Sequence, residues 1–273
     1  MIDLRLNYSE IAKALELFIV DEVRGAGFKK VILGLSGGID SAIVAFLAQR
    51  ALGNENVFAV MMPYKTSSED SLSHAKLVID QLKIKSETKP ITSAADSYFT
   101  STAEMTPLRK GNVMARLRMI TLYDLSVREN ALVIGTSNKT ELMLGYGTQF
   151  GDMASALNPI GDLYKTQIWQ LSEFLGVPKP IIEKQPSADL WIGQTDEQEM
   201  GFSYANADQI LYQMIDLRLT DEEIILTGYE KETVLKIRKM VIRSQYKRKL
   251  PLIAKLTTRT VGIDFHYPRD WRI

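Results

Sequence analysis

Hydrophobic residues recur along the chain in two patterns, as short apolar runs and as longer segments with a helical period. Short runs rich in Val, Ile, Leu and Met predict strands, while apolar residues three and four positions apart predict helices. The expected strands are residues 30–35, 57–62, 86–91 and 131–134. The expected helices are residues 9–25 (capped by Asn7 or Ser9), 41–52, 68–82, 112–129, 165–175 and 232–247, and a capping-box sequence at 220–223 predicts the start of one more.

This strand–helix alternation predicts an α/β fold with a doubly wound parallel sheet, wrapped by helices on both faces. We expect a single domain over residues 1–273, with an α/β core at about 28–175 and a mainly helical portion at 176–273. Residues 145–161 are rich in glycine and polar side chains and predict a long loop of the kind that closes over substrates. Other segments expected to lack regular structure are residues 185–201 and the tail at 259–273.

The loop after the first expected strand has the pattern of a phosphate-binding device. Residues 34–41 read GLSGGIDS, and their glycine pair lets backbone N–H groups point inward at a helix start, whose dipole favours an anion. The serines can donate hydroxyl hydrogen bonds, and Asp40 offers the hard oxygen that Mg²⁺ prefers. No Gly-Lys-Ser/Thr closes the loop, so it is not a Walker A motif; an ordinary glycine-rich turn is the alternative. The residues expected to bind ATP here are Gly34, Leu35, Ser36, Gly37, Gly38, Ile39, Asp40 and Ser41.

A second polar loop, residues 135–141, follows the last expected strand. Because ligands of parallel sheets bind beyond the carboxyl ends of the strands, both loops are expected to face one site. Glu141 would then join Asp40 in holding Mg²⁺, since two carboxylates and phosphate oxygens suit an octahedral ion. The alternative is that Glu141 is only a favourable anion in the first turn of a helix.

Composition narrows the class of protein. Lys+Arg 33 balances Asp+Glu 33, so no overall attraction to polyanions is indicated. The sequence contains no cysteine, which excludes disulfides, thiolate nucleophiles, zinc–sulfur sites and cysteine-dependent glutamine hydrolysis. No signal peptide or membrane-length apolar stretch is seen, so a cytoplasmic enzyme with no membrane partner is expected.

The strongest basic cluster, residues 236–249, raises the question of nucleic-acid binding. Apolar residues recur through it at helical spacing, which indicates an amphipathic helix with a solvated basic face. With no overall positive charge and no RNA-binding module, no nucleic-acid partner is expected.

The two loops belong to a larger set of ordered segments that resembles the ammonia-dependent NAD synthetases. The first loop is itself similar to the pyrophosphate loop of the ATP pyrophosphatases, which split ATP into AMP and pyrophosphate. The resemblance extends over nearly the whole chain and implies the adenine nucleotide α-hydrolase-like fold. Its matching segments are residues 36–41 (SGGIDS), 111–119 (GNVMARLRM), 135–141 (GTSNKTE), 151–152 (GD), 158–165 (NPIGDLYK), 186–190 (PSADL) and 246–248 (YKR).

The resemblance also implies roles for single residues. The implied ATP contacts beyond the first loop are Thr136, Lys165 and Ser187, with Glu141 as a metal ligand. A lysine at a helix start can place its ammonium on a phosphate, although most single lysines are merely solvated. The implied contacts with the dinucleotide substrate are Arg116, Gln149, Tyr246 and Lys247. Arg118 lies two residues from Arg116 and faces another way, so a structural ion pair or an interface contact is expected for it.

Some positions depart from the family pattern. Gln149 and Ala156 stand where some members carry a lysine and an aspartate, and Tyr246 stands where many have histidine. The departures concern the dinucleotide half of the site and leave the ATP half intact. His74 and His266 lie outside every motif, so a histidine general base is not expected.

The implied activity is the amidation of nicotinic acid adenine dinucleotide to NAD by ammonia, with ATP as co-substrate and Mg²⁺ as cofactor. The implied catalytic residues are Asp40, Lys165 and Asp152, the last orienting or deprotonating ammonium. Members of this type are homodimers, and the helix at 112–129 is apolar on more than one side, at positions that include Ile120 and Leu125. Two alternatives remain open, namely another adenylating ligase, such as a tRNA-modifying enzyme, and a regulator that binds ATP without turnover.

Overall fold

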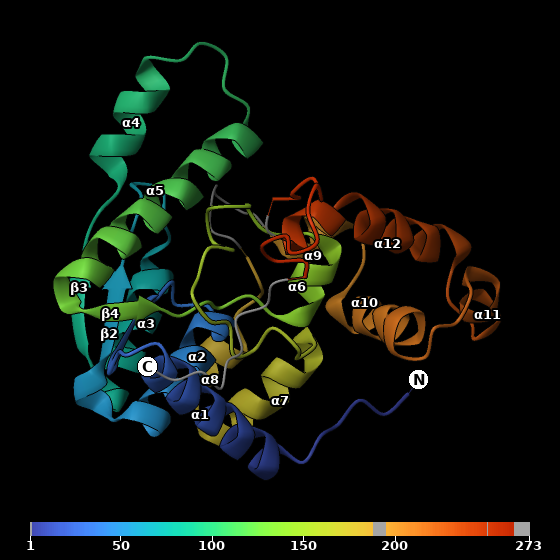
Figure 1. The fold of residues 1–273 in the computed structure, drawn as a ribbon, viewed down its shortest axis with the longest axis horizontal. Coiled ribbons are helices and arrows are strands. Elements are labelled where there is room, and N and C mark those ends of the chain that lie inside the picture. The colour runs from blue at the N-terminus through green and yellow to red at the C-terminus, as the bar shows by residue number, and fades with distance from the viewer. Residues whose placement is uncertain (1, 188–194, 250, 265–273) are drawn as a thin grey trace.

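The computed structural model describes residues 2–187, 195–249 and 251–264. In this part of the chain, parallel strands form one sheet of order β3-β2-β1-β4 (Figure 1). The strands are β1 (Lys30–Gly34), β2 (Val57–Met61), β3 (Lys85–Thr88) and β4 (Ala131–Val133). β1 lies between β2 and β4, so the predicted phosphate loop leaves the middle of the sheet. The predicted parallel α/β sheet is confirmed.

Helices cover both faces of the sheet, as predicted for a doubly wound fold. Successive side chains of a strand point to opposite faces, so Val31 and Leu33 enter one core and Ile32 enters the other. The first core is shared with α1 (Tyr8–Gly25), α2 (Ile39–Leu52), α3 (Glu69–Leu82), α7 (Lys165–Leu175) and α8 (Lys179–Ile182). The second core is shared with α4 (Thr92–Thr100) and the long helix α5 (Pro107–Glu129).

The remaining helices form a third hydrophobic core, which includes Leu144 and Tyr164 from the edge of the α/β part. In Figure 1 the C-terminal members of this group lie on the far side of the group's first helix from the sheet, in orange and red. They are α6 (Lys139–Leu144), α9 (Asp196–Met200), α10 (Tyr204–Leu211), α11 (Asp221–Leu226) and α12 (Lys231–Arg243). α10 contacts both α6 and α7, so it packs beside the ends of the loops that precede these two helices. The division of the chain at about residue 175 stays a prediction.

Several element bounds differ from the sequence-based expectation. The helix expected at 112–129 begins at Pro107, because the Thr106 side chain accepts a hydrogen bond from the Arg109 amide and caps it. α4 was not expected, since it is polar and buries only Ala95. The segment expected to be irregular at 185–201 contains α9, while residues 188–194 and the tail at 265–273, with His266, lie outside the described residues.

The long loop expected at 145–161 is confirmed, since the chain runs without helix or strand from the end of α6 to the start of α7. Leu157, in this loop, forms a parallel bridge with Ile134, just after β4. Among the described residues, no helix combines the length and the apolar character needed to cross a bilayer.

Candidate active site

A cavity of about 540 Å³ opens at the carboxyl ends of the central strands. The loops after β1 and β4 line it, together with parts of α5, the loop at 145–161, residues 184–187 and α9. Of the residues predicted to bind ATP, those that line it are Gly34, Leu35, Ser36, Gly38, Ile39, Asp40, Ser41, Thr136, Lys165 and Ser187. Segments far apart in the sequence therefore meet in one place; residues 188–190, which complete the motif at 186–190, lie outside the described residues.

The phosphate loop is held by its own serines. Ser41 Oγ accepts a hydrogen bond from the Ser36 amide at 3.2 Å and donates one to the Gly38 carbonyl at 3.0 Å. The two serine hydroxyls lie 3.1 Å apart. Gly38 caps α2 without a side-chain hydrogen bond, so the helix start presents its dipole to the cavity.

Gly37 is closely packed against the backbone of α3. Its φ is +78°, and a Cβ on it would lie 2.1 Å from the Ser71 carbonyl oxygen of α3. Gly38, by contrast, has a φ of −89°, and a Cβ on it would meet only Ser36 Oγ, at 3.4 Å.

This contrast separates the two glycines experimentally. Gly37→Ala is expected to displace the loop from α3, lower stability by about 1–3 kcal/mol and abolish ATP binding. Gly38→Ala, the matched control, is expected to fold with near-native stability. Calorimetric titration with ATP and thermal unfolding of both variants check this. Native ATP affinity in Gly37→Ala would show that the close approach to Ser71 does not shape the loop.

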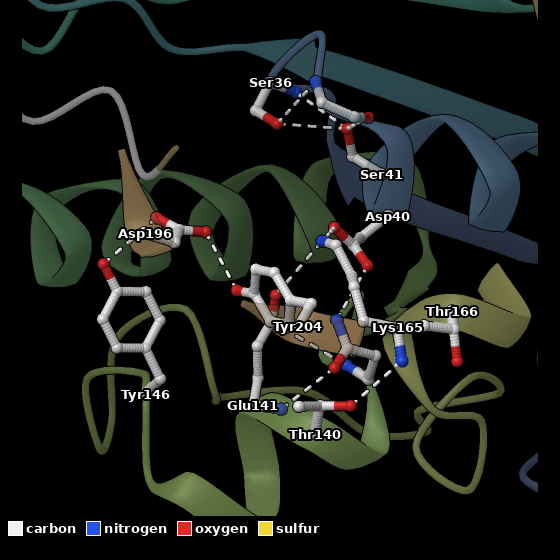
Figure 2. A network of polar contacts seen from close by, with 12 residues as sticks. Ser36, Asp40, Ser41, Thr140, Glu141, Tyr146, Lys165, Thr166, Asp196 and Tyr204 are labelled. Carbon is white, nitrogen blue, oxygen red and sulfur yellow. Dashed lines mark hydrogen bonds and ion pairs between the residues drawn. The ribbon is translucent and has the colours of Figure 1, made fainter. Parts of the chain in front are cut away.

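The predicted metal ligands meet around a buried ammonium. Lys165 Nζ lies 2.5 Å from Asp40 Oδ2 and 3.6 Å from Glu141 Oε1 (Figure 2), and the lysine is 2% exposed. Asp40 Oδ1 also accepts a hydrogen bond from Asn138 Nδ2 at 2.9 Å. The two loops are thus tied together directly, through side chains as well as through the sheet.

The electrostatics of this cluster follow from burial and proximity. Burial alone lowers the pKa of Lys165, but the charges of Asp40 and Glu141 outweigh it and hold that pKa above its usual value. Burial, followed by the neighbouring Asp40 charge, raises the pKa of Glu141 to about 8. A carboxyl with so high a pKa needs more positive charge beside it before it ionises fully at neutral pH.

The donor set fits Mg²⁺. Two carboxylates converge on one point that already attracts a cationic group, and they border the phosphate loop. The described residues contain no cluster of three His, Cys, Asp or Glu side chains suited to a metal. Mg²⁺ characteristically takes one or two carboxylates and fills its other positions with phosphate oxygens and water. Asp40 and Glu141 could therefore hold Mg²⁺ together with the phosphate oxygens of a bound nucleotide.

Asp152, in the loop at 145–161, and Lys247, which follows α12 in the chain, both line the cavity. Lys247 Nζ donates hydrogen bonds to the Gly145 and Gly147 carbonyls, both at 2.8 Å, and burial lowers the pKa of this lysine. Asp152 Oδ1 accepts a hydrogen bond from the Thr148 amide at 2.8 Å, and burial raises the pKa of Asp152. These hydrogen bonds tie the loop to Lys247 and leave the Asp152 carboxyl at the cavity wall.

The other residues predicted to contact the dinucleotide gather outside the cavity lining found among the described residues. Arg116 Nη2 donates to the Gln149 carbonyl at 3.1 Å, and Gln149 Nε2 lies 3.5 Å from the Tyr246 carbonyl. Arg118, not Arg116, lines the cavity, and its Nε donates to the Met62 carbonyl at 3.0 Å. The assignment of Arg116 to the dinucleotide stays a prediction, and its place is on the outer side of the loop at 145–161.

Sequence reasoning missed several residues around the cluster. Asn138 caps α6 and begins a capping box with Glu141, a spacing that the sequence does display. Asp196 of α9 accepts a hydrogen bond from the Tyr204 hydroxyl at 3.0 Å, and the Tyr204 ring lies 5.2 Å from Lys165 Nζ. Figure 2 shows Asp196 between the hydroxyls of Tyr146 and Tyr204. No local pattern marks Asp196, because only the packing of the C-terminal helices brings it here.

The sequence of this chain is similar to those of known proteins. Residues 11–251 match the family described as NAD synthase. An NH(3)-dependent NAD(+) synthetase of Chlorobaculum parvum is 57% identical over 270 residues, which are 99% of this chain and 98% of the relative. The chain belongs to the NAD synthase family. Its predicted resemblance is confirmed, and so is its assignment as an enzyme of the ligase class.

Two solved structures of NAD synthase relatives share the fold. NMN synthetase from Francisella tularensis is 35% identical, with a TM-score of 0.82 over 92% of this chain and 99% of that one. The NH3-dependent NAD synthetase from Campylobacter jejuni is 35% identical, with a TM-score of 0.79 over 92% of this chain and all of that one, at 100%. Both support the adenine nucleotide α-hydrolase-like fold.

Proposed function

We propose that this NAD synthase family member amidates nicotinic acid adenine dinucleotide with ammonia to give NAD, converting ATP to AMP and pyrophosphate. The observation that carries the proposal is the meeting of Asp40, Glu141 and Lys165 beside the phosphate loop in one cavity. The similarity of this chain, over nearly its full length, to an NH(3)-dependent NAD(+) synthetase supports the choice of substrates.

In the first step a nicotinate carboxylate oxygen attacks the α-phosphorus of ATP, and the bond from that phosphorus to the bridging oxygen breaks. Pyrophosphate leaves into the Ser36–Ser41 loop, where backbone N–H groups and the start of α2 stabilise its charge. Lys165 is placed to neutralise charge that grows on the leaving group, because its buried ammonium keeps its proton. Asp40 and Glu141 would hold Mg²⁺, which supplies further neutralisation and orients the phosphates.

In the second step ammonia attacks the carbonyl carbon of the acyl-adenylate, the bond to the AMP oxygen breaks and one proton leaves the nitrogen. Asp152 lines the cavity, and burial raises its pKa, which makes it a better acceptor for that proton. The sequence has no cysteine, and this route uses no covalent enzyme intermediate.

The deciding assay supplies ATP, Mg²⁺, ammonium and nicotinic acid adenine dinucleotide, and measures AMP, pyrophosphate and NAD. We expect all three products in equal amounts. A parallel arm with glutamine in place of ammonium is expected to give none, and an arm with the nicotinate mononucleotide tests the specificity that the NMN synthetase relative makes relevant. ATP binding without products would favour a regulator, and pyrophosphate release only with tRNA would favour a tRNA-modifying ligase.

We also propose that the enzyme is a cytoplasmic homodimer that pairs through the outer face of α5. Ile120 is 57% exposed and Val127 is 83% exposed on that face. Leu125, in contrast, is 2% exposed and packs in the second core, so it belongs to the face of α5 that is buried against the sheet.

Ile120→Glu is therefore expected to give a folded monomer, because a charge on an exposed apolar face blocks association without disturbing the core. Dinucleotide affinity should fall while ATP affinity survives. Leu125→Glu, the internal comparison, is expected to unfold the chain. Sedimentation velocity measures both. A wild-type protein that sediments as a monomer with full activity contradicts the homodimer.

A further inference from the structure

The carboxylate of Asp208, on α10, is fully buried between the starts of two helices that carry active-site residues. Its Oδ1 accepts a hydrogen bond from Thr140 Oγ1 at 2.5 Å, in α6. Its Oδ2 accepts one from the Thr166 amide at 2.7 Å, in α7. The carboxylate therefore bridges the residue beside Glu141 and the residue beside Lys165.

A second hydrogen bond closes this bridge. Thr140 Oγ1 accepts from the Lys165 amide at 3.0 Å, so one hydroxyl contacts both Asp208 and α7 (Figure 2 shows Thr140 and Thr166). Thr140 is itself fully buried. The first two amides of α7 are thus bound by side chains of α6 and α10, which fixes how far Lys165 stands from Glu141.

Burying a charged carboxylate inside a core costs free energy, and burial accordingly raises the pKa of Asp208. The positive end of the α7 dipole and the two hydrogen bonds compensate for part of this cost. The same helix α10 also presents the Tyr204 ring to Lys165 Nζ, one turn before Asp208. α10 therefore contacts the α7 backbone next to Lys165, at the Thr166 amide, and also the Lys165 side chain.

We propose that Asp208 is a positioning residue, which acts through Thr140 and the α7 amides to set the separation of Glu141 and Lys165. The inference rests on the proposed function for its kinetic readout, since those two residues serve the adenylation step. Asp208 itself does not line the cavity, as far as the described residues define it.

The test compares Asp208→Asn with Asp216→Asn. Asp216 is the comparison, because it accepts hydrogen bonds from Lys139 Nζ and the Tyr164 hydroxyl of the same two helical regions without contacting Lys165 or Glu141. Its side chain is 32% exposed whereas Asp208 is fully buried, so Asp208→Asn is expected to lose about 5 °C in melting temperature and Asp216→Asn less. Only Asp208→Asn is expected to lower kcat by about 10- to 100-fold at an unchanged KM for the dinucleotide.

A second pair of variants keeps the test decisive if Asp208→Asn fails to fold. Thr140→Ser keeps the relaying hydroxyl and is expected to retain kcat within about threefold, whereas Thr140→Val lacks it and should match Asp208→Asn. Equal kcat in the Ser and Val variants, or a kcat loss in Asp208→Asn no larger than in Asp216→Asn, overturns the inference.

The experiments distinguish failure of the proposed function from failure of the positioning role of Asp208. If the wild-type protein makes no NAD, that function falls, and the calorimetric affinity for ATP with Mg²⁺ still decides the positioning role. Weaker ATP binding in Asp208→Asn and Thr140→Val, with native binding in Asp216→Asn and Thr140→Ser, supports it. Native binding in all four overturns it.

Discussion

Asp40→Asn is expected to fold, at a stability lowered by the broken pair with Lys165, and to lose NAD synthesis by about 100-fold or more. The amide keeps the size of the side chain and can still accept the hydrogen bond from Asn138, so the loop contacts survive. It removes one of the two charges that would hold Mg²⁺ beside the pyrophosphate. Steady-state rates over a Mg²⁺ titration measure the loss of NAD synthesis, and thermal unfolding in parallel measures the change in stability.

The control for this variant is Asp80→Asn, which removes an equal charge from an exposed position on α3. Its rate and melting temperature should match those of the wild type. Turnover near the native rate in Asp40→Asn at saturating Mg²⁺ would show that Asp40 is not a metal ligand.

Lys165→Met is expected to lower kcat/KM for ATP by about 100-fold while affinity for the dinucleotide changes little. Methionine fills the buried space of the lysine stem but supplies no charge. Without the ammonium, the pKa of Glu141 rises further, because burial and the Asp40 charge then act on it with no positive charge beside it. ATP then meets a site with less positive charge where its leaving group must separate.

Lys139→Met provides the comparison, because Lys139 is also buried and also pairs with a carboxylate, Asp216, at 3.0 Å. It lies outside the lining of the cavity as the described residues define it. Lys165→Met should lose about 3–5 kcal/mol at most from its broken buried pair, and Lys139→Met should lose less, because Asp216 is partly exposed. If the Michaelis constant for ATP and the turnover number stay native in Lys165→Met, the lysine has no role in ATP use.

The fold was largely predictable because its informative signals are local. The strands of the central sheet are continuous apolar runs buried on both faces, and the loop after β1 carries its glycines and Asp40 within a few residues. β3 is less regular in sequence because it lies at the edge of the sheet and is mostly exposed, and its predicted end was therefore late. α4 and α10 gave weak signals, since polar residues occupy much of each helix.

The candidate site was predictable only as far as its motifs reach. Asp40, Glu141 and Lys165 each stand in a segment that a family resemblance marks, and the structure brings all three together. Asp196, Tyr204 and Asp208 come from the C-terminal helices, and their place depends on how α10 packs on α6 and α7. Residues of that kind become visible only after the tertiary packing is known.

The ion pair between Lys165 and Asp40 joins positions 125 residues apart. Contacts over such a separation form late, because the chain must first lose the entropy of closing the intervening loop. During synthesis the phosphate loop and α2 therefore emerge and begin to fold well before their cationic partner exists. A nascent chain that ends before Lys165 therefore holds the phosphate loop without the positive charge that balances Asp40 in the folded protein.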